Sequence, residues 1–531
     1  MTSAPLTAAP RRPDQTVPAR PGRLPALAYA VLGALLLALL AATAPHGEWV
    51  SDSWIHAATV TEVARHPLHP LEPLTGEHAP FAYFSPWAMA LGWFMRLTGW
   101  SVWVVLTVGG LAGTVLLLTA WYRFVRALTA ARWAPVLGLA LMLLLWGTGT
   151  WFWSGFPMLG SLSLGFVWPS VVAGACWFEL WRTALRIDTV GRVHRLVVFA
   201  VLPGLTLLVH PFTAALAALS VLLTLAVRLR RTPRPVIGAA LAAVVSGLAA
   251  LAWPWISVRA MLGDQAGFDA IHHMLYQDPV GKYALLPLIV PALVVRVVRD
   301  RRDPLFWTAA VCAVGVAAGA VTGSWSLGRL APGIVLPGHA ALAVLLAECW
   351  QSRATLRRGA RAAAAVLAGL TAVALVVGAN ANAWTVARAL PGATPRAHAE
   401  VATDSQRPYP RLGWLAAHVG DGEVAVANNW QTRRELPTYG LRTVRTQWPS
   451  PGVPDEARRA ADEDRILGWA KATSDERAAL LARYHVRWIL WRPTAHTPTW
   501  PYPGARLVAC GRDGIALLRV DPAAGRPSAC P

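Results

Sequence analysis

Eleven long apolar runs constrain the fold of this chain more than any other feature of its sequence. Most of them approach the roughly 20 residues that an α-helix needs to cross the hydrocarbon core of a bilayer. Composition agrees, because 55% hydrophobic and only 14% charged residues give more apolar side chain than a soluble surface accommodates. The predicted spans are 24–44, 101–122, 133–153, 163–181, 196–213, 213–227, 236–257, 283–298, 304–322, 330–349 and 362–382.

Arginine placement predicts the orientation of these spans, because positively charged residues stay on the cytoplasmic side. Before residue 383, 23 basic residues fall in the N-terminal segment and in every second loop, and 5 fall in the opposite loops. We therefore expect a multi-pass protein of the plasma (inner) membrane with a cytoplasmic N-terminus and an extracytoplasmic C-terminus. The net charge of +20 is spread over small clusters between apolar runs, so no nucleic-acid partner is expected.

The sequence divides into three parts. Residues 1–23 are rich in Pro and Arg and are predicted to be a disordered cytoplasmic tail. Residues 24–382 form an α-helical polytopic membrane domain, with long outer loops at 45–100 and 258–282. Residues 383–531 are expected to form a small extracytoplasmic α/β domain. Its predicted strands and helices are 424–427, 486–491 and 515–520, and 455–470 and 474–484.

Two further features of the C-terminal part lead to specific expectations. The helix at 474–484 should be capped by Ser474 or Asp475, whose side chains can accept a hydrogen bond from the first turn. Cys510 and Cys530 lie on the oxidising side of the membrane, where a disulfide and two free thiols are both open alternatives.

The first outer loop holds the best candidate for chemistry. Asp52 and His56 lie on a stretch of helical character, and their i, i+4 spacing places them on one face. A carboxylate held by a neighbouring imidazole is a good acceptor for the proton of an attacking hydroxyl. The alternative is that Asp52 only caps a helix that begins at Ser53, and the two roles are compatible.

Several short motifs give the chain a resemblance to a known superfamily. They are S-D-S-W-I-H at 51–56, H-P-L at 66–68, F-A-Y-F-S-P-W-A-M-A-L at 81–91, H-P-F at 210–212 and A-L-L-A-R-Y-H-V-R-W-I-L-W at 479–491. With the multi-span body and the C-terminal α/β domain, they resemble the GT-C superfamily of membrane glycosyltransferases. The resemblance implies transfer of a sugar from a polyprenyl-phosphate donor to a hydroxyl of a cell-envelope glycan, lipid or protein. It also implies that Asp52 is the general base, and direct displacement would invert the anomeric centre.

The departing phosphate of such a donor needs cationic or hydrogen-bonding partners near the membrane plane. Arg329, at the outer end of the tenth span, is the first candidate, and the alternative is an interfacial arginine whose charge only reaches water. The second long outer loop supplies further candidates for the phosphate: Arg259, His272, His273 and Lys282.

Three residues are candidates for contacts with the sugar or the acceptor: Trp54, Glu62 and His210. For Trp54, anchoring at the membrane interface is the default role. His210 lies at bilayer depth, where a polar side chain is costly unless it is paired or faces a cavity. A packed, hydrogen-bonded histidine is therefore the alternative to a functional one.

No cofactor is predicted to be required. The histidines and acids of residues 66–78 are interrupted by prolines, which do not place them on one face, so we expect no metal site there. The first loop lacks an acidic D-x-D pair, which leaves dependence on a divalent metal open. No GxxxxGK[ST] or GxGxxG motif is present, which argues against ATP-driven or dinucleotide chemistry.

Two other classes of function were weighed. A secondary transporter or lipid flippase should carry charged residues deep in several spans and inverted-repeat halves, and neither pattern is visible. A non-catalytic cell-envelope scaffold is the other alternative, and Asp52 in an outer loop argues against it.

Overall fold

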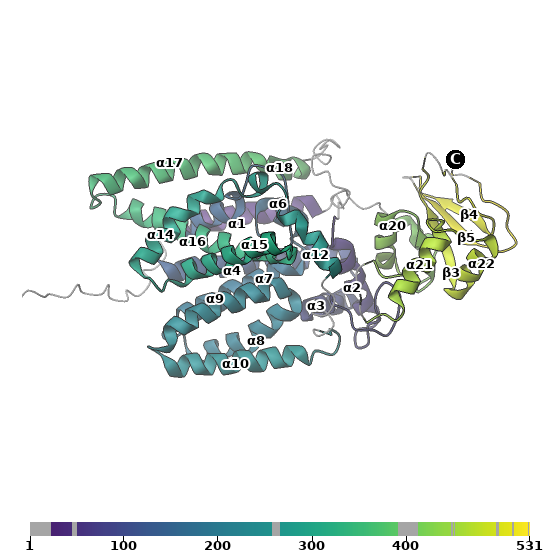
Figure 1. The fold of residues 1–531 in the computed structure, drawn as a ribbon, viewed down its shortest axis with the longest axis horizontal. Helices are drawn as coiled ribbons and strands as arrows, with labels where there is room; N and C mark the ends of the chain where they lie inside the picture. The colour runs from purple at the N-terminus through teal and green to yellow at the C-terminus, as the bar shows by residue number, and fades with distance from the viewer. Residues whose placement is uncertain are drawn as a thin grey trace, which may run out of the picture.

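The computed structural model describes residues 23–44, 50–257, 266–390, 412–447, 450, 452–494, 497, 499–511, 514–528 and 530. These residues form a long helical bundle and a smaller domain with a β-sheet, which follow one another along the long axis of the molecule (Figure 1). The predicted tail, apart from Arg23, lies outside the described residues.

Among the described residues, nine helical segments are long and apolar enough to cross a membrane. They are Arg23–Thr43 (α1), Val102–Leu128 (α4), Arg192–Val209 (α8), Pro211–Leu229 (α9), Pro233–Leu251 (α10), Pro279–Arg299 (α13, η3 and α14), Pro304–Thr322 (α15), Trp325–Gln351 (η4 and α16) and Arg358–Ala381 (α17). The two segments with several labels divide into Pro279–Tyr283 (α13), Leu286–Ile289 (η3), Val290–Arg299 (α14), Trp325–Leu330 (η4) and Pro332–Gln351 (α16).

The two remaining predicted spans correspond to shorter helices, Ala134–Leu144 (α5) and Pro169–Leu185 (α7). α7 packs against α4, α8 and α9, so most of its surface faces protein instead of lipid. This position allows side-chain hydrogen bonds to neighbouring helices: the indole N–H groups of Trp177 and Trp181 donate to the hydroxyls of Ser220 and Thr224. A buried helix needs less hydropathy than a lipid-facing one, which is consistent with the charged Glu179 and Arg182 in the 17-residue α7.

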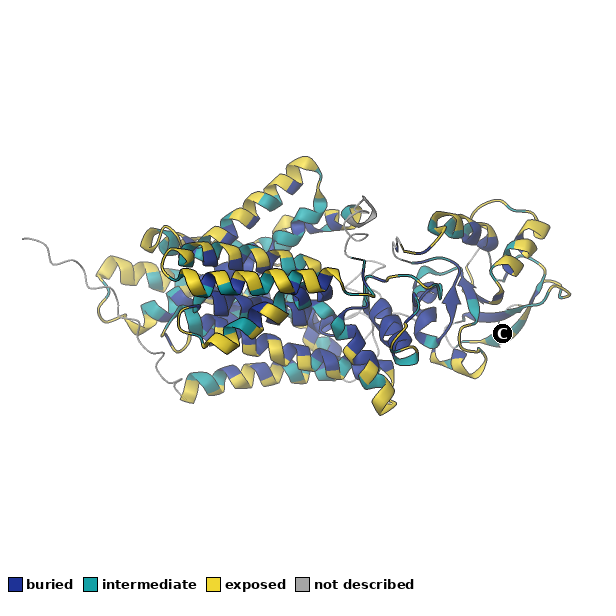
Figure 2. Ribbon diagram, turned by 90° about the horizontal axis from the view of Figure 1, so that it is seen from below, coloured by how far each residue is buried: buried dark blue, intermediate teal, exposed yellow. Residues whose placement is uncertain are grey.

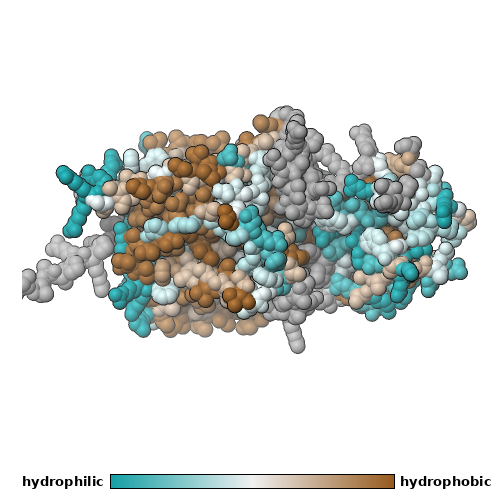
Figure 3. Space-filling model, turned by 45° about the horizontal axis from the view of Figure 1, so that its top comes forward, coloured by the Kyte–Doolittle hydropathy of each residue, from teal (hydrophilic) through white to brown (hydrophobic). Residues whose placement is uncertain are grey.

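The outer faces of the bundle are apolar. Buried residues fill the interior of the bundle and the C-terminal sheet, whereas exposed residues follow the outward faces of the helices (Figure 2). Along α10 and α17 the exposed residues are large and aliphatic, including Ile237, Leu241, Val245, Val366 and Val373. On the face seen in Figure 3, hydrophobic residues form a band across the bundle, with hydrophilic residues at the end remote from the C-terminal domain. This surface is one that lipid tails would cover.

The outer loops carry short helices that join the bundle to the C-terminal domain. Ser53–Arg65 (α2) confirms the predicted helix of the first loop. Pro86–Thr98 (α3) was not predicted. It begins after the cap Ser85, ends at Gly99 with φ 68°, and packs along α2. The other short segments of the membrane domain are Leu159–Gly165 (α6), Ala266–His272 (α12), His273–Leu275 (η2) and Ala383–Ala389 (α18).

The C-terminal domain is the expected small α/β domain, with a five-stranded sheet in the order β2-β1-β3-β5-β4. β1 pairs in parallel with β2 and β3, and β5 pairs antiparallel with β3 and β4. The strands are Val424–Ala427 (β1), Arg442–Thr443 (β2), Val486–Trp491 (β3), Ala505–Cys510 (β4) and Ala516–Val520 (β5). The helices are Gly413–Ala417 (η6), Trp430–Glu435 (α20), Leu436–Tyr439 (η7), Glu456–Leu467 (α21) and Ser474–Arg483 (α22).

Two expectations for this domain can be compared with the structure. The cap of α22 is Thr473, one residue before the predicted Ser474, and it forms a reciprocal capping box with Glu476. Thr473 is the cap because Glu476 then occupies the third helical position, from which its carboxylate accepts a hydrogen bond from the Thr473 backbone N–H.

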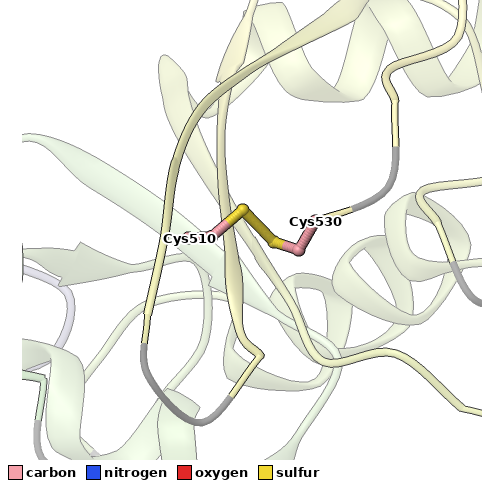
Figure 4. The surroundings of a disulfide bond; sticks show 2 residues. All are labelled: Cys510 and Cys530. Atoms are coloured by element: carbon pink, nitrogen blue, oxygen red, sulfur yellow. A yellow bond between two sulfur atoms is a disulfide. The ribbon is translucent and has the colours of Figure 1, made fainter.

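Cys510 at the end of β4 is bonded to Cys530, so the disulfide is the correct one of the two alternatives for these cysteines (Figure 4).

The C-terminal domain docks on the first outer loop through α20 and η7, which pack against α2. Arg442 on β2 lies at the centre of this contact. Its guanidinium pairs with the buried Glu62 at 2.7 Å and donates to the carbonyl of Pro73 at 2.9 Å. The backbone N–H of Thr443 donates to the carbonyl of Leu74 at 2.6 Å, so the loop also covers the edge of the sheet at β2.

We expect Arg442→Gln to lower the free energy of unfolding by about 3 kcal/mol, because it leaves the Glu62 carboxylate buried without its cation. The pair is almost completely shielded, with side-chain exposures of 10% and 2%. Chemical denaturation of the full chain in detergent would measure the change.

Arg65→Gln is the matched control for this measurement. It removes an ion pair between the same two parts of the chain, with Asp421 at 3.0 Å, but in a more exposed place. Such pairs contribute less than about 1 kcal/mol. Equal losses in the two variants would contradict a central role for Arg442.

Candidate functional site

Asp52 lies at the entrance to α2, but its side chain does not cap the helix. The residue occupies the N-cap position and makes no side-chain capping hydrogen bond. The preceding Ser51 has φ 49°, in the left-handed region that non-glycine residues rarely adopt and that recurs at functional sites. The Asp52 side chain is partly accessible, and no hydrogen bond to it occurs among the described residues. The predicted alternative of a capping role alone therefore lacks its defining contact.

The Asp52 carboxylate lies in the field of two arginines from different parts of the chain. Burial raises the pKa of Asp52, and Arg434 and Arg329 oppose that shift through their charges. A carboxylate with a raised pKa binds a proton more tightly, which makes it a stronger base once ionised. The two guanidinium groups keep the ionised form accessible in this partly desolvated place.

Arg329 points into the protein and not outward to water. Its Nη1 donates to the carbonyl of Ser154 at 2.6 Å, and its guanidinium lies over the rings of Trp153 and Phe212, at 5.3 and 4.6 Å from the centroids. Its Nε is buried with no hydrogen-bond partner in the described part of the chain. An inward cation with an unused donor beside Asp52 does not fit an arginine that only reaches for the interface.

Neighbouring segments fix the position of Arg329. The carboxylate of Asp269 accepts from the backbone N–H groups of Trp325 and Ser326, at 3.1 and 2.8 Å, and so holds the start of η4. Gly155 has φ 84°, and a Cβ there would lie 3.2 Å from the His210 ring. The glycine therefore allows the turn that presents the Ser154 carbonyl to Arg329.

His210 has a structural role at the turn between α8 and α9. Its Nδ1 accepts from the backbone N–H of Thr213 at 3.3 Å and contacts the Thr213 hydroxyl at 2.7 Å, so the ring caps α9. The following Pro211 favours the extended backbone that His210 adopts. With Nδ1 accepting, the ring proton is on Nε2, which faces the Ser154 hydroxyl at 3.4 Å. This geometry favours the packed, hydrogen-bonded alternative over a sugar contact.

Arg434 is a further candidate for the site that the sequence analysis did not include. It lies on α20 of the C-terminal domain, and its guanidinium lies over the rings of Trp54 and Trp430, at 5.4 and 4.5 Å from the centroids. The i, i+4 spacing of Trp430 and Arg434 was the only local signal. It could not reveal Asp52 as the neighbour, because domain docking brings the two together.

Three further candidates from the first loop contact other side chains of the protein. The ring of His56 packs on Tyr83, with centroids 5.2 Å apart, and no hydrogen bond joins it to the Asp52 carboxylate among the described residues. Burial lowers the pKa of His56 to about 3, so the ring is neutral. Trp54 is buried under Arg434. Glu62 uses both carboxylate oxygens, for His66 and Leu71 on one side and Arg442 on the other.

Two candidates in the second outer loop, His272 and His273, pack against residues around Arg329, and Lys282 binds backbone carbonyls. His272 is buried with its ring 5.3 Å from Phe212 and 6.0 Å from Trp153, the two rings that carry the Arg329 guanidinium. His273 contacts Trp325 at the start of η4, at 4.4 Å between centroids. Lys282 donates to the carbonyls of Met274 and Gln277, both at 2.5 Å. Arg259 lies outside the described residues.

No group of three or more histidine, cysteine or acidic side chains is placed to hold a metal within the described ranges. In the first loop, Glu72 accepts from the backbone of Leu74 and Thr75, and Glu77 pairs with Arg459. That no cofactor is required stays a prediction, and dependence on a divalent metal stays open.

The fold was compared with known proteins. No family model and no curated protein matches the chain. The arabinofuranosyltransferase AftD from Mycobacteria matches with a TM-score of 0.56 and 18% identity, over 93% of this chain and 40% of that one. ArnT from Cupriavidus metallidurans, bound to undecaprenyl phosphate, matches with a TM-score of 0.50 and 15% identity, over 94% and 98% of the two chains.

A third solved structure has a TM-score of 0.46 and 12% identity, over 88% of this chain and 70% of the other. It is the archaeal oligosaccharyltransferase AglB from Archaeoglobus fulgidus, in complex with an inhibitory peptide and a dolichol-phosphate. The likeness to AftD and ArnT extends over nearly the whole length of this chain. The chain therefore shares its fold with AftD and ArnT.

Proposed function

We propose that this chain is a glycosyltransferase that moves a sugar from a polyprenyl-phosphate donor to a hydroxyl of a cell-envelope acceptor on the extracytoplasmic side. One observation carries the proposal. The Asp52 carboxylate, without a hydrogen bond among the described residues, is influenced by the charge of Arg329, whose buried Nε lacks a partner there. This transfer needs a base and a phosphate-binding cation that act at the same site. The undecaprenyl phosphate bound to the Cupriavidus neighbour supports a lipid phosphate as the donor's carrier.

The proposed reaction is a direct displacement. The acceptor hydroxyl gives its proton to an Asp52 carboxylate oxygen as its own oxygen bonds to the anomeric carbon. The bond from that carbon to the phosphate oxygen breaks, and polyprenyl phosphate leaves with the electron pair. Arg329 stabilises the charge that develops on the departing phosphate. Attack opposite the leaving group inverts the anomeric centre.

Incubation of the purified full chain with a panel of radiolabelled polyprenyl-phosphate sugars tests this function. We expect at least one donor to release polyprenyl phosphate in the wild type and not in Asp52→Asn. Equal release by both proteins would contradict the assignment of Asp52, and no release from any donor would contradict the donor class.

Arg434→Gln should move the acidic limb of the pH profile of kcat/KM to higher pH. Asp52 works in its ionised form, so activity is lost as pH falls through its pKa. Arg434 opposes the rise in that pKa, so its removal raises the pKa further. Arg434→Lys keeps the charge and should leave the limb near its wild-type position. An unmoved limb in Arg434→Gln would show that this residue acts only through packing on Trp54.

We also propose that the C-terminal domain is extracytoplasmic, as the arginine distribution predicts. Reporter fusions after residues 128, 190, 232, 300 and 357 should report the cytoplasm, and fusions after 75, 270 and 420 should report the outer compartment. A cytoplasmic signal from the 420 fusion would place the candidate site on the wrong side for the proposed acceptor.

A further inference from the structure

A basic pocket lies at the end of the bundle remote from the C-terminal domain. It has a volume of about 600 Å³ and is lined by Arg23 and Leu24 at the start of α1, Arg132 and Trp133 before α5, and Trp350 and Arg353 at the end of α16. This size is in the range of sites for small ligands. The hydrophilic residues of this end are visible in Figure 3. Segments far apart in the sequence thus bring three arginines around one hollow.

The charge of this pocket is not neutralised by the protein. Its lining contains no acidic residue, and no ion pair involves Arg23, Arg132 or Arg353 among the described residues. The nearby Glu348 on α16 is already used, because Arg299 donates to it at 3.2 Å and the Thr129 hydroxyl at 2.8 Å. Three arginines converging on a hollow without a counterion favour a bound anion, and guanidinium forks match phosphate oxygens.

The surroundings of the pocket distinguish a lipid headgroup from a small soluble anion. The indoles of Trp133 and Trp350 are exposed, and the Arg353 guanidinium lies over the Trp350 ring at 4.5 Å from its centroid. Exposed tryptophans are typical of the level of lipid headgroups. From Leu24 in the pocket, exposed aliphatic residues continue along α1 toward the middle of the bundle: Leu27, Val31 and Leu35. This stripe offers a path for an acyl chain whose headgroup is held by the arginines.

We propose that this pocket binds the phosphate headgroup of an anionic phospholipid in the leaflet opposite the C-terminal domain. The arginines hold the phosphate, the tryptophans flank the headgroup, and the aliphatic stripe of α1 lies along the chain. The site is separate from the Asp52 region and does not depend on the proposed transferase activity.

Native mass spectrometry of the full chain in detergent, with added phosphatidylglycerol or phosphatidylcholine, tests the proposal. The wild type should retain phosphatidylglycerol selectively. The variant R132Q/R353Q should bind it roughly 25-fold more weakly, since each arginine near an anionic headgroup contributes about fivefold. The matched control is R301Q/R302Q, which removes two exposed arginines outside the pocket at the same end of the bundle, and it should stay within about twofold of wild type.

Several outcomes would overturn the proposal. They are equal retention of the two lipids, an equal loss in R301Q/R302Q, and displacement of phosphatidylglycerol by millimolar inorganic phosphate, which would indicate a site for a soluble anion. If R132Q/R353Q melts below the wild type, R353Q alone replaces it, and a loss of about fivefold is then expected.

Discussion

Replacing Asp52 with asparagine should abolish sugar transfer while leaving the protein folded. The amide preserves the shape of the side chain but cannot take a proton, and loss of a general base typically costs about 10²–10⁴-fold in rate. Stability should change little, because the Asp52 side chain makes no capping hydrogen bond to α2. The measurement is kcat with labelled donor and acceptor, with thermal melting of the same preparations alongside.

Two companion variants sharpen this test. Asp52→Glu keeps the base but moves it by one methylene, so its rate should fall between those of the wild type and Asp52→Asn. Asp421→Asn makes the same chemical change near the far end of α2, where Asp421 pairs with Arg65, and should leave turnover unchanged. Wild-type turnover in Asp52→Asn would reject the catalytic assignment, and with it the main structural reason for the proposed reaction.

Arg329→Ala should lower kcat/KM for the lipid-phosphate donor by about 10²–10³-fold. That is the typical cost of removing one group that stabilises charge developing in a transition state. Arg329→Lys should recover part of the loss, because lysine restores the charge but not the planar fork that also binds the Ser154 carbonyl. Initial rates over a range of donor concentrations give both kcat and KM.

Arg96→Ala is the matched control for Arg329. Arg96 is an exposed arginine on α3 whose guanidinium donates to the carbonyl of Ala64 at 3.1 Å, so it represents an arginine of the outer surface without a role in the site. Its removal should change kcat/KM by less than about twofold. Equal effects of the two alanine variants would indicate that Arg329 acts through packing or surface charge alone.

The structure also explains why some candidate residues could not be assigned from sequence. Glu62 is an acidic residue on the same helix as His56, yet its carboxylate pairs with Arg442, which lies on a strand of another domain. Lys282 has the charge of a phosphate ligand, but its amine holds two backbone carbonyls. A charged side chain needs hydrogen-bond or ion-pair partners, and only the tertiary structure shows which residues provide them.

The sequence by itself determined the apolar spans of the membrane domain, together with three strands and two helices of the C-terminal domain. These features depend on local patterns, because the free energy of transferring an apolar run to lipid, or of burying one face of a strand, is summed over neighbouring residues. The helix α2, which begins directly after Asp52, was likewise predicted from a local pattern. Only the tertiary structure decided that the charges of Arg329 and Arg434 act on Asp52, and that the His56 ring packs on Tyr83. Both arginines are hundreds of positions from Asp52 in the sequence. They approach it only when the bundle packs and the C-terminal domain docks, which no local pattern encodes.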